Sequence, residues 1–218
     1  MMQSLSEENY LKAIYHLSSL SQNKVSIKSV SDVLNNNPAS VIGMLKKLTH
    51  KKLVQYDKFK GAKLTDKGLK IALLIVRKHR LWEVFLLEKL GYNWDEIHDI
   101  AEQLEHVKQN DLVERLDKFL GFPEYDPHGD PIPKSNGQLP ATVSNLLSGI
   151  EVGKTCRVAA VKDTSTIFLQ YLLKLSVSIG TKIKVIDKIA FDGSMKIQLR
   201  KGVETIVSQK FAESLLVD

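Results

Sequence analysis

Residues 35–64 read NNNPASVIGMLKKLTHKKLVQYDKFKGAKL, and this stretch decides the fold of the first part of the chain. The three asparagines predict a turn, and Pro38 is well placed as the first residue of a helix over residues 38–51. Apolar residues at positions 41, 44, 45 and 48 share one face of that helix. Two short strands, 53–56 and 62–64, follow around a basic turn. A helix followed by a lysine-rich hairpin is typical of a winged helix-turn-helix.

The residues before this stretch complete the pattern. Ser4 and Glu7 have the spacing of a capping box, and apolar residues at 10, 11, 14 and 17 follow at helical spacing. A short second helix fits residues 27–34. Residues 1–64 carry ten lysines and four acidic residues, so their net charge of +6 equals that of the whole chain. Three helices, a hairpin and a basic surface predict a DNA-binding domain over residues 1–64.

The third helix is expected to enter the major groove of DNA with its N-terminal residues facing the base edges. Those residues are small, the nearby lysines would meet phosphates, and the hairpin tip would touch the backbone or the minor groove. The alternative is a three-helix domain with a solvated lysine surface. The predicted DNA contacts are Pro38, Ala39, Ser40, Gly43, Lys46, Lys47, Lys58, Lys60 and Lys63.

Residues 65–121 are predicted to be helical, over 65–90, 94–107 and 111–120. His79 and Glu83 are four residues apart and share a helix face. On the next helix one imidazole, two carboxylates and a second imidazole form a stripe about 100° wide. Nitrogen and oxygen donors without cysteine suit Mn(II), Fe(II) or Zn(II). A single such pair is more often a surface pair, but two stripes favour a metal. The second stripe is His98, Glu102, Glu105 and His106.

Enzyme motifs are absent from these helices. There is no His-Glu-x-x-His, and residues 102–106 lack the leading histidine of the inverted motif. The chain is therefore predicted not to be an enzyme, and a hydrolytic metalloenzyme is the weakest alternative. A second alternative stays open, in which the His/Glu stripe of a winged-helix regulator is a structural dimer interface without metal sensing.

Proline and glycine divide the chain. Five of the six prolines lie between Pro123 and Pro140, which predicts a Pro-rich linker over 122–150. His128 lies in this loop, from which it could reach the helices. Beyond it, β-type segments at 155–161, 182–189, 195–200 and 205–207 surround one helix, 166–175. The predicted fold is a mainly α N-terminal part followed by a small β-barrel over 151–218.

The cellular setting follows from what the composition lacks. The single cysteine, Cys156, excludes a disulfide framework and predicts a buried thiol in a reducing compartment. Residues 1–8 do not have the pattern of a signal peptide, and no apolar run approaches the length of a membrane span. We therefore expect a cytoplasmic protein.

Several of these segments together resemble a known family. They are ENYLKAIY (8–15), LTDKG (64–68), RKHRLWE (77–83), HDIAEQLEH (98–106) and PHGDPIP (127–133). The chain resembles the metal-dependent transcriptional repressors of the diphtheria toxin repressor and manganese transport regulator type. The resemblance covers nearly the whole chain and is weaker in the C-terminal part.

The resemblance implies a winged-helix domain, a helical metal-binding and dimerisation domain over 65–121, and an SH3-like C-terminal domain. It implies a homodimer that binds a palindromic operator in double-stranded DNA and represses metal-uptake genes. The implied co-repressor is Mn(II) or Fe(II), with Zn(II) or other divalent metals as substitutes in vitro; no membrane or organic substrate is implied. The implied ligands are His79, Glu83 and His98 in one site and Glu102, Glu105, His106 and Asn9 in the other, with Asp126, His128 and Asp163 supplied from outside the helices.

Three positions depart from the family pattern. Glu102 stands where iron-type members have a cysteine, so this site looks like the manganese type. Asn9 stands where other members have Asp or Met, and Lys12 replaces a carboxylate found in some members. The N-terminal helix therefore brings less negative charge to the second site than it does in those members.

Overall fold

The computed structural model describes residues 3–20 and 24–218. The chain forms two compact units. The first contains the chain up to residue 79 together with residues 102–113 and 133–138, and the second contains residues 80–101, 114–132 and 139–218.

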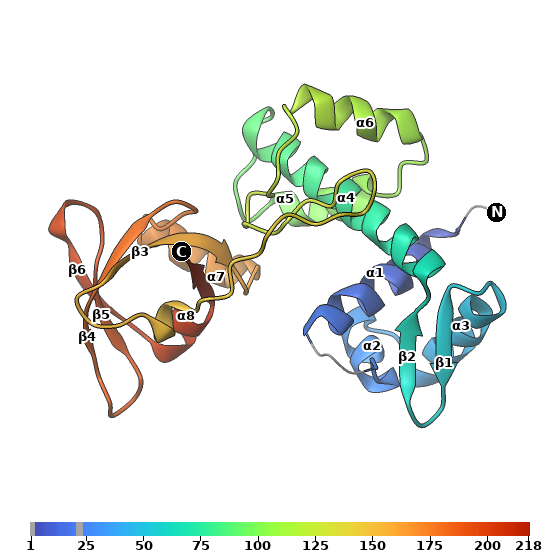
Figure 1. Ribbon diagram of the computed structural model, residues 1–218, viewed down its shortest axis with the longest axis horizontal. Helices are drawn as coiled ribbons and strands as arrows, with labels where there is room; N and C mark the ends of the chain where they lie inside the picture. The colour runs from blue at the N-terminus through green and yellow to red at the C-terminus, as the bar shows by residue number, and fades with distance from the viewer. Residues whose placement is uncertain (1–2, 21–23) are drawn as a thin grey trace. The chain divides into compact units, whose positions relative to one another are not determined.

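The winged helix-turn-helix predicted for the start of the chain is present (Figure 1). It consists of α1 (Leu5–Leu20), α2 (Ile27–Leu34), α3 (Pro38–His50), β1 (Val54–Asp57) and β2 (Gly61–Leu64). Local caps set the helix ends. The Ser4 and Glu7 side chains each accept a hydrogen bond from the other residue's backbone N–H, and Asn37 Oδ1 accepts one from the Ser40 N–H at 2.8 Å.

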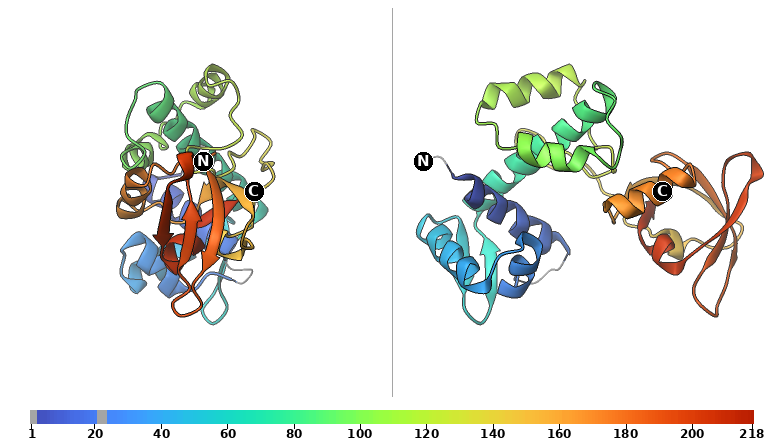
Figure 2. Two further views of the ribbon diagram at one scale, coloured as in Figure 1. Left: turned by 90° about the vertical axis from the view of Figure 1, so that its left-hand side faces the viewer. Right: turned by 180° about the vertical axis from the view of Figure 1, so that it is seen from behind.

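The core of this domain is the apolar face that the sequence pattern predicts. Seen from behind, the three blue helices pack together beside the cyan hairpin (Figure 2, right). Antiparallel β1 and β2 pair Val54 with Leu64, and a bridge from Val25 to Ala62 joins the chain before α2 to the hairpin. Fully buried core side chains include Leu11, Ile14, Val30, Val41, Leu45 and Leu48.

Three helices follow the hairpin: α4 (Asp66–Glu88), α5 (Ile97–Leu104) and α6 (Asn110–Phe119). The helix predicted over 94–107 is shorter at both ends. The Asn93 N–H donates to Glu96 at 2.9 Å and holds a turn ahead of α5, while Glu105 and His106 lie in a turn just after it. None of the helices among the described residues is long and apolar enough to cross a membrane.

The C-terminal part contains an antiparallel sheet in the order β6-β5-β4-β3-β7. Its elements are β3 (Thr155–Val161), α7 (Thr166–Lys174), β4 (Lys182–Lys188), β5 (Met195–Gln198), β6 (Glu204–Val207), α8 (Gln209–Glu213) and β7 (Leu215–Val217). The curved orange and red strands are visible in Figure 2 (left).

The predicted fold class is confirmed with one correction, because this sheet is open and not a closed barrel. Its end strands β6 and β7 do not pair with each other. The sequence pattern missed α8 and β7, since five and three residues are too few to show a period. The predicted Pro-rich segment is irregular apart from the 3-10 helix η1 (Leu147–Gly149) and short bridges such as Tyr125 to Pro131.

Candidate metal centre

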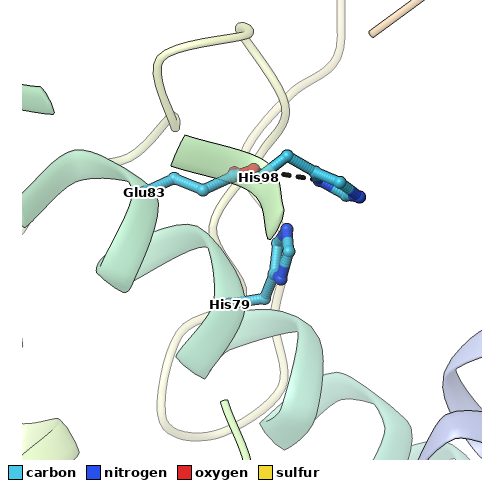
Figure 3. A group of neighbouring side chains, drawn as sticks. All are labelled: His79, Glu83 and His98. Atoms are coloured by element: carbon cyan, nitrogen blue, oxygen red, sulfur yellow. Dashed lines mark hydrogen bonds and ion pairs between the residues drawn. The ribbon is translucent and has the colours of Figure 1, made fainter. Parts of the chain in front are cut away.

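Glu83 is the centre of one group of ligand-type side chains, which we call the Glu83 cluster: His79, Glu83, His98, Asp126 and His128. Glu83 lies on α4 and is 2% exposed. Its Oε1 atom lies 3.3 Å from His98 Nδ1 and 3.7 Å from His128 Nδ1. His79 precedes Glu83 by one turn of α4, and Figure 3 shows both side chains on one side of this helix with the His98 ring beside them.

Asp126 shapes the loop that carries His128. Its Oδ1 atom accepts hydrogen bonds from the N–H groups of His128 and Asp130, at 2.8 and 2.9 Å. Arg80 on α4 holds the loop from the other side, with Nε 3.4 Å from Asp126 and Nη2 3.2 Å from Asp130. The His128 ring stacks on Trp94, with centroids 5.7 Å apart. The carboxylate and imidazole are therefore held in place before any ligand binds.

The same loop is anchored to the sheet. The Val161 N–H of β3 donates to the His128 carbonyl at 2.9 Å. Gly129 adopts φ +87°, and a Cβ at this position would lie 2.1 Å from the Ala159 carbonyl oxygen. Only glycine fits here without a shift of the backbone. The ligand loop is thus fastened to the C-terminal sheet as well as to α4.

The Glu83 cluster concentrates negative charge where water is scarce. Burial raises the pKa of Asp126 to about 8, with Glu83 and Asp130 adding to the rise and Arg80 and His128 opposing it. Burial opposes the charged form of His128, yet its bond to Glu83 and the nearby carboxylates raise its pKa. Among the described residues, His128 Nε2 is buried without a hydrogen-bond partner. Buried imidazole nitrogens and carboxylate oxygens are donor types that fit a divalent metal ion.

A second group contains His79, Glu102 and Glu105, and here a lysine lies in the middle. Lys12 Nζ lies 2.5 Å from Glu102 Oε1, 2.6 Å from Glu105 Oε2 and 3.2 Å from His79 Nδ1. His79 Nδ1 also lies 2.7 Å from Glu105 Oε2. We call these four residues the Lys12 cluster.

His106 and Asn9 lie at the edge of the Lys12 cluster. His106 Nδ1 lies 2.6 Å from Glu8 Oε2. Glu8 was not among the site residues predicted from the sequence. Glu8 and Lys12 are four residues apart on α1, so helical spacing was the available signal. In the part of the chain that the structure describes, Asn9 Oδ1 and Glu105 Oε1 are buried without a hydrogen-bond partner.

Asp163, predicted to be a ligand from the C-terminal domain, lies in none of the three His/carboxylate groups found among residues 3–20 and 24–218. Its Oδ1 atom accepts a hydrogen bond from the Ser165 N–H at 2.9 Å, ahead of α7. Its assignment as a ligand stays a prediction, as do those of the other ligand residues.

The predicted DNA contacts share one property, exposure to solvent. The first turn of α3 is exposed, as are the hairpin lysines. Asp57 accepts hydrogen bonds from the Phe59 and Lys60 N–H groups and shapes the hairpin tip, where Phe59 is 91% exposed. The residues concerned are Pro38, Ala39, Ser40, Gly43, Lys46, Lys47, Lys58, Lys60 and Lys63.

Glu7 ties α1 to the C-terminal end of α3. Its side chain is 1% exposed, and Oε1 lies 2.7 Å from Lys51 Nζ and 3.2 Å from Lys47 Nζ. Burial alone would raise the pKa of Glu7, but hydrogen bonds with Lys51, the Ser4 backbone and Lys47 lower it to about 2. The Lys47 side chain keeps 55% of its surface exposed, so it still reaches solvent.

Comparison with known families and proteins gives a consistent result. Residues 2–62 match the iron-dependent repressor N-terminal DNA-binding domain, and residues 65–134 match the iron-dependent repressor metal-binding and dimerisation domain. Residues 145–218 match the FeoA domain. A solved structure described as a manganese-dependent transcriptional repressor in complex with manganese is 35% identical, with a TM-score of 0.87, over 97% of this chain and 98% of that one.

This chain belongs to the family of metal-dependent transcriptional repressors. The iron-dependent repressor IdeR of Mycobacterium tuberculosis is 32% identical over 126 residues, 58% of this chain and 54% of IdeR. A probable metal transport system membrane protein of Chlamydia trachomatis is 49% identical over 71 residues, 33% of this chain and 16% of that protein. This repressor-family chain thus spans about half of IdeR and a smaller part of the chlamydial protein.

Proposed function

We propose that this repressor-family chain is activated by a divalent metal ion bound in the Glu83 cluster. The observation that carries the proposal is the buried Glu83 carboxylate, which has an imidazole on each side and a second buried carboxylate nearby. Imidazole nitrogens and carboxylate oxygens grouped in this way are the donors that divalent first-row metals use. In this proposal the protein is a cytoplasmic homodimer without catalytic activity, and it represses metal-uptake genes.

The proposed ligands of this ion are Glu83, His98, Asp126 and His128, with His79 completing the set. His79 uses Nδ1 toward Glu105, which leaves Nε2 as the nitrogen that would face the metal. Bound there, a divalent ion would add positive charge between the Glu83 and Asp126 carboxylates. Mn(II) and Fe(II) are the proposed physiological ions, because carboxylate oxygens suit hard ions and this cluster contains no thiolate.

DNA binding is assigned to the exposed start of α3 and to the hairpin lysines. In a symmetric dimer, two such helices would meet successive major grooves of a palindromic operator. Metal activates if it binds the DNA-competent arrangement better than the other arrangements, and DNA must then tighten metal binding by the same factor. The resemblance alone implies Asn9, Glu102, Glu105, His106 and Asp163 as ligands of further ions.

The test is a titration of the full chain with operator DNA in Mn(II), in Fe(II) without oxygen, and in chelator. We expect metal to tighten operator binding at least tenfold, and the Glu83→Gln variant to bind equally weakly in all three conditions. Equal affinity of the unaltered chain in all three conditions would contradict metal activation. It would favour the alternative, in which Glu102→Ala and His106→Ala change dimerisation of a protein that has no metal response.

A further inference from the structure

The Lys12 cluster resembles a metal site that already contains a cation. Two carboxylates and one imidazole nitrogen lie within 3.2 Å of a single nitrogen atom, Lys12 Nζ. We infer that the Lys12 ammonium group takes the place of a metal ion between His79, Glu102 and Glu105. Metal sensing by this chain is then confined to the Glu83 cluster, and Lys12 determines how many metal ions the chain binds.

The hydrogen bonds of Lys12 support this inference. An ammonium group has three N–H donors and no acceptor. Here two carboxylate oxygens, one from Glu102 and one from Glu105, accept from it, and His79 Nδ1, which is also 2.7 Å from Glu105, lies 3.2 Å away. The Lys12 side chain is 9% exposed and Glu105 is fully buried, so water does not readily replace Glu105 as a partner, while the Glu102 side chain is 37% exposed. The ammonium group therefore offsets the charge of the buried Glu105 carboxylate without an added ion.

Charge and space exclude a second cation. A metal ion would need to approach each donor atom to about 2.0–2.2 Å, which is the region that Nζ occupies. The ion and the ammonium group cannot lie together there, because they repel each other and compete for the same lone pairs. A divalent ion would have to expel a lysine that is already paired with two carboxylates.

The lysine also makes the position of α1 independent of metal. Lys12 joins α1 to the end of α5 and to the turn that follows it. Glu7, about one and a half turns earlier on α1, forms ion pairs with Lys47 of α3 and with Lys51, the residue that caps the end of α3. Both links are ion pairs within the first unit. Helix α3 is thus connected through α1 to Glu102 and Glu105 by ion pairs that need no metal.

The experiment counts Mn(II) ions per protomer, by equilibrium dialysis of the full chain followed by metal analysis. It uses the Glu83→Gln background, which removes the first site in the proposed function on which this inference rests. We expect Glu83→Gln to bind no Mn(II). Adding Lys12→Glu or Lys12→Met should restore one ion, because the Glu102 and Glu105 carboxylates lose their internal cation.

Lys70→Glu is the matched control, since Lys70 is an exposed residue of α4 and its reversal changes the net charge equally. It should restore no ion. The inference is overturned if Glu83→Gln alone keeps an ion that the further change Glu105→Gln removes. It is also overturned if both Lys12 variants keep the circular dichroism spectrum of their parent and bind no ion.

These outcomes separate the inference from the proposed function. If the unaltered chain binds no Mn(II) but the Lys12→Glu chain binds one ion, the proposed function fails and the inference stands. If the unaltered chain binds two ions and loses one with Glu105→Gln, the inference fails and metal activation stands.

Discussion

The Glu83 and Lys12 clusters both combine imidazoles with carboxylates, and the Lys12 cluster also contains an ammonium group. Glu83 is 2% exposed and Glu105 is fully buried, and each lies beside imidazole nitrogen and a second carboxylate. In the Lys12 cluster the protein supplies an ammonium group at 2.5–2.6 Å from two carboxylates. In the Glu83 cluster Arg80 lies 3.4 Å from Asp126, and Glu83 lies beside two imidazoles. If both proposals hold, two similar groups of carboxylates and imidazoles have opposite needs for metal.

The sharpest test of this difference compares Glu83→Gln with Glu102→Gln. Loss of a residue that only supports a ligand costs about 10- to 100-fold in metal affinity, so loss of the shared Glu83 carboxylate should cost more than about 100-fold. Glu102→Gln should change Mn(II) affinity less than about threefold, because its partner is Lys12. Isothermal titration calorimetry measures both. Similar losses in the two variants would remove the distinction between the clusters.

The second test measures the stability that Lys12 provides without metal. Lys12→Met keeps the aliphatic stem and leaves the fully buried Glu105 without its ammonium partner. Breaking one partner of a buried ion pair costs about 3–5 kcal/mol, and we expect a loss of about 3 kcal/mol in the free energy of unfolding. Urea denaturation in chelator measures it. Lys70→Met, at an exposed site, should stay within about 0.5 kcal/mol of the unaltered protein.

The third test concerns Glu7, at the other end of the α1 connection. Its pKa is about 2 in the folded protein and 4.5 as the ordinary value, so its ionised form stabilises the fold. A folded-state pKa that is lowered gives stability that is present above about pH 4.5 and is lost as the pH falls toward 2. Glu7→Gln keeps the capping hydrogen bond and should cost about 2 kcal/mol at pH 7, allowing for the salt-screened Lys47.

The same measurement at lower pH supplies the control. The difference in unfolding free energy between the Glu7→Gln variant and the unaltered protein should shrink between pH 5 and pH 3. A difference that stays constant over this range would show that the Glu7 charge does not stabilise the link between α1 and α3.

The smallest expected effect separates backbone strain from a steric clash in the ligand loop. Gly129→Ala places a methyl group 2.1 Å from the Ala159 carbonyl oxygen, whereas Gly121→Ala, also at positive φ, meets nothing within 4 Å. Gly121→Ala should cost about 1 kcal/mol through its backbone conformation alone. Gly129→Ala should cost about 1–2 kcal/mol more and weaken Mn(II) binding, measured by thermal unfolding with and without the ion. Equal costs would indicate that the loop is not fastened to β3.

Much of the fold could be predicted because its signals are local. Pro38, the Ser4–Glu7 capping box and the hairpin that follows α3 act over a few residues, and the structure confirms the winged helix that they predict. The prediction was wrong where signals are short or distant. The end of α5 before Glu105, and the short α8 and β7, depend on packing that a periodic pattern does not record.

In the candidate site, too, local spacing could be predicted from the sequence and contacts between distant residues could not. The spacing of His79 and Glu83, and the stripe that begins at His98, were visible because helical neighbours are three or four residues apart. The place of Lys12 was not, because 67, 90 and 93 residues separate it from His79, Glu102 and Glu105. The sequence showed only that a lysine had replaced a carboxylate.

The sequence by itself determined the kinds of donor atoms, the helices that carry them and the basic charge of residues 1–64, since these depend on composition and short spacing. Only the tertiary structure decided which carboxylates are paired with Lys12. It also decided that Glu83 lies between two imidazoles, those of His98 and His128. The reason is physical. The free energy of a buried charge depends on the atoms within a few ångströms of it, and packing of distant segments chooses those atoms.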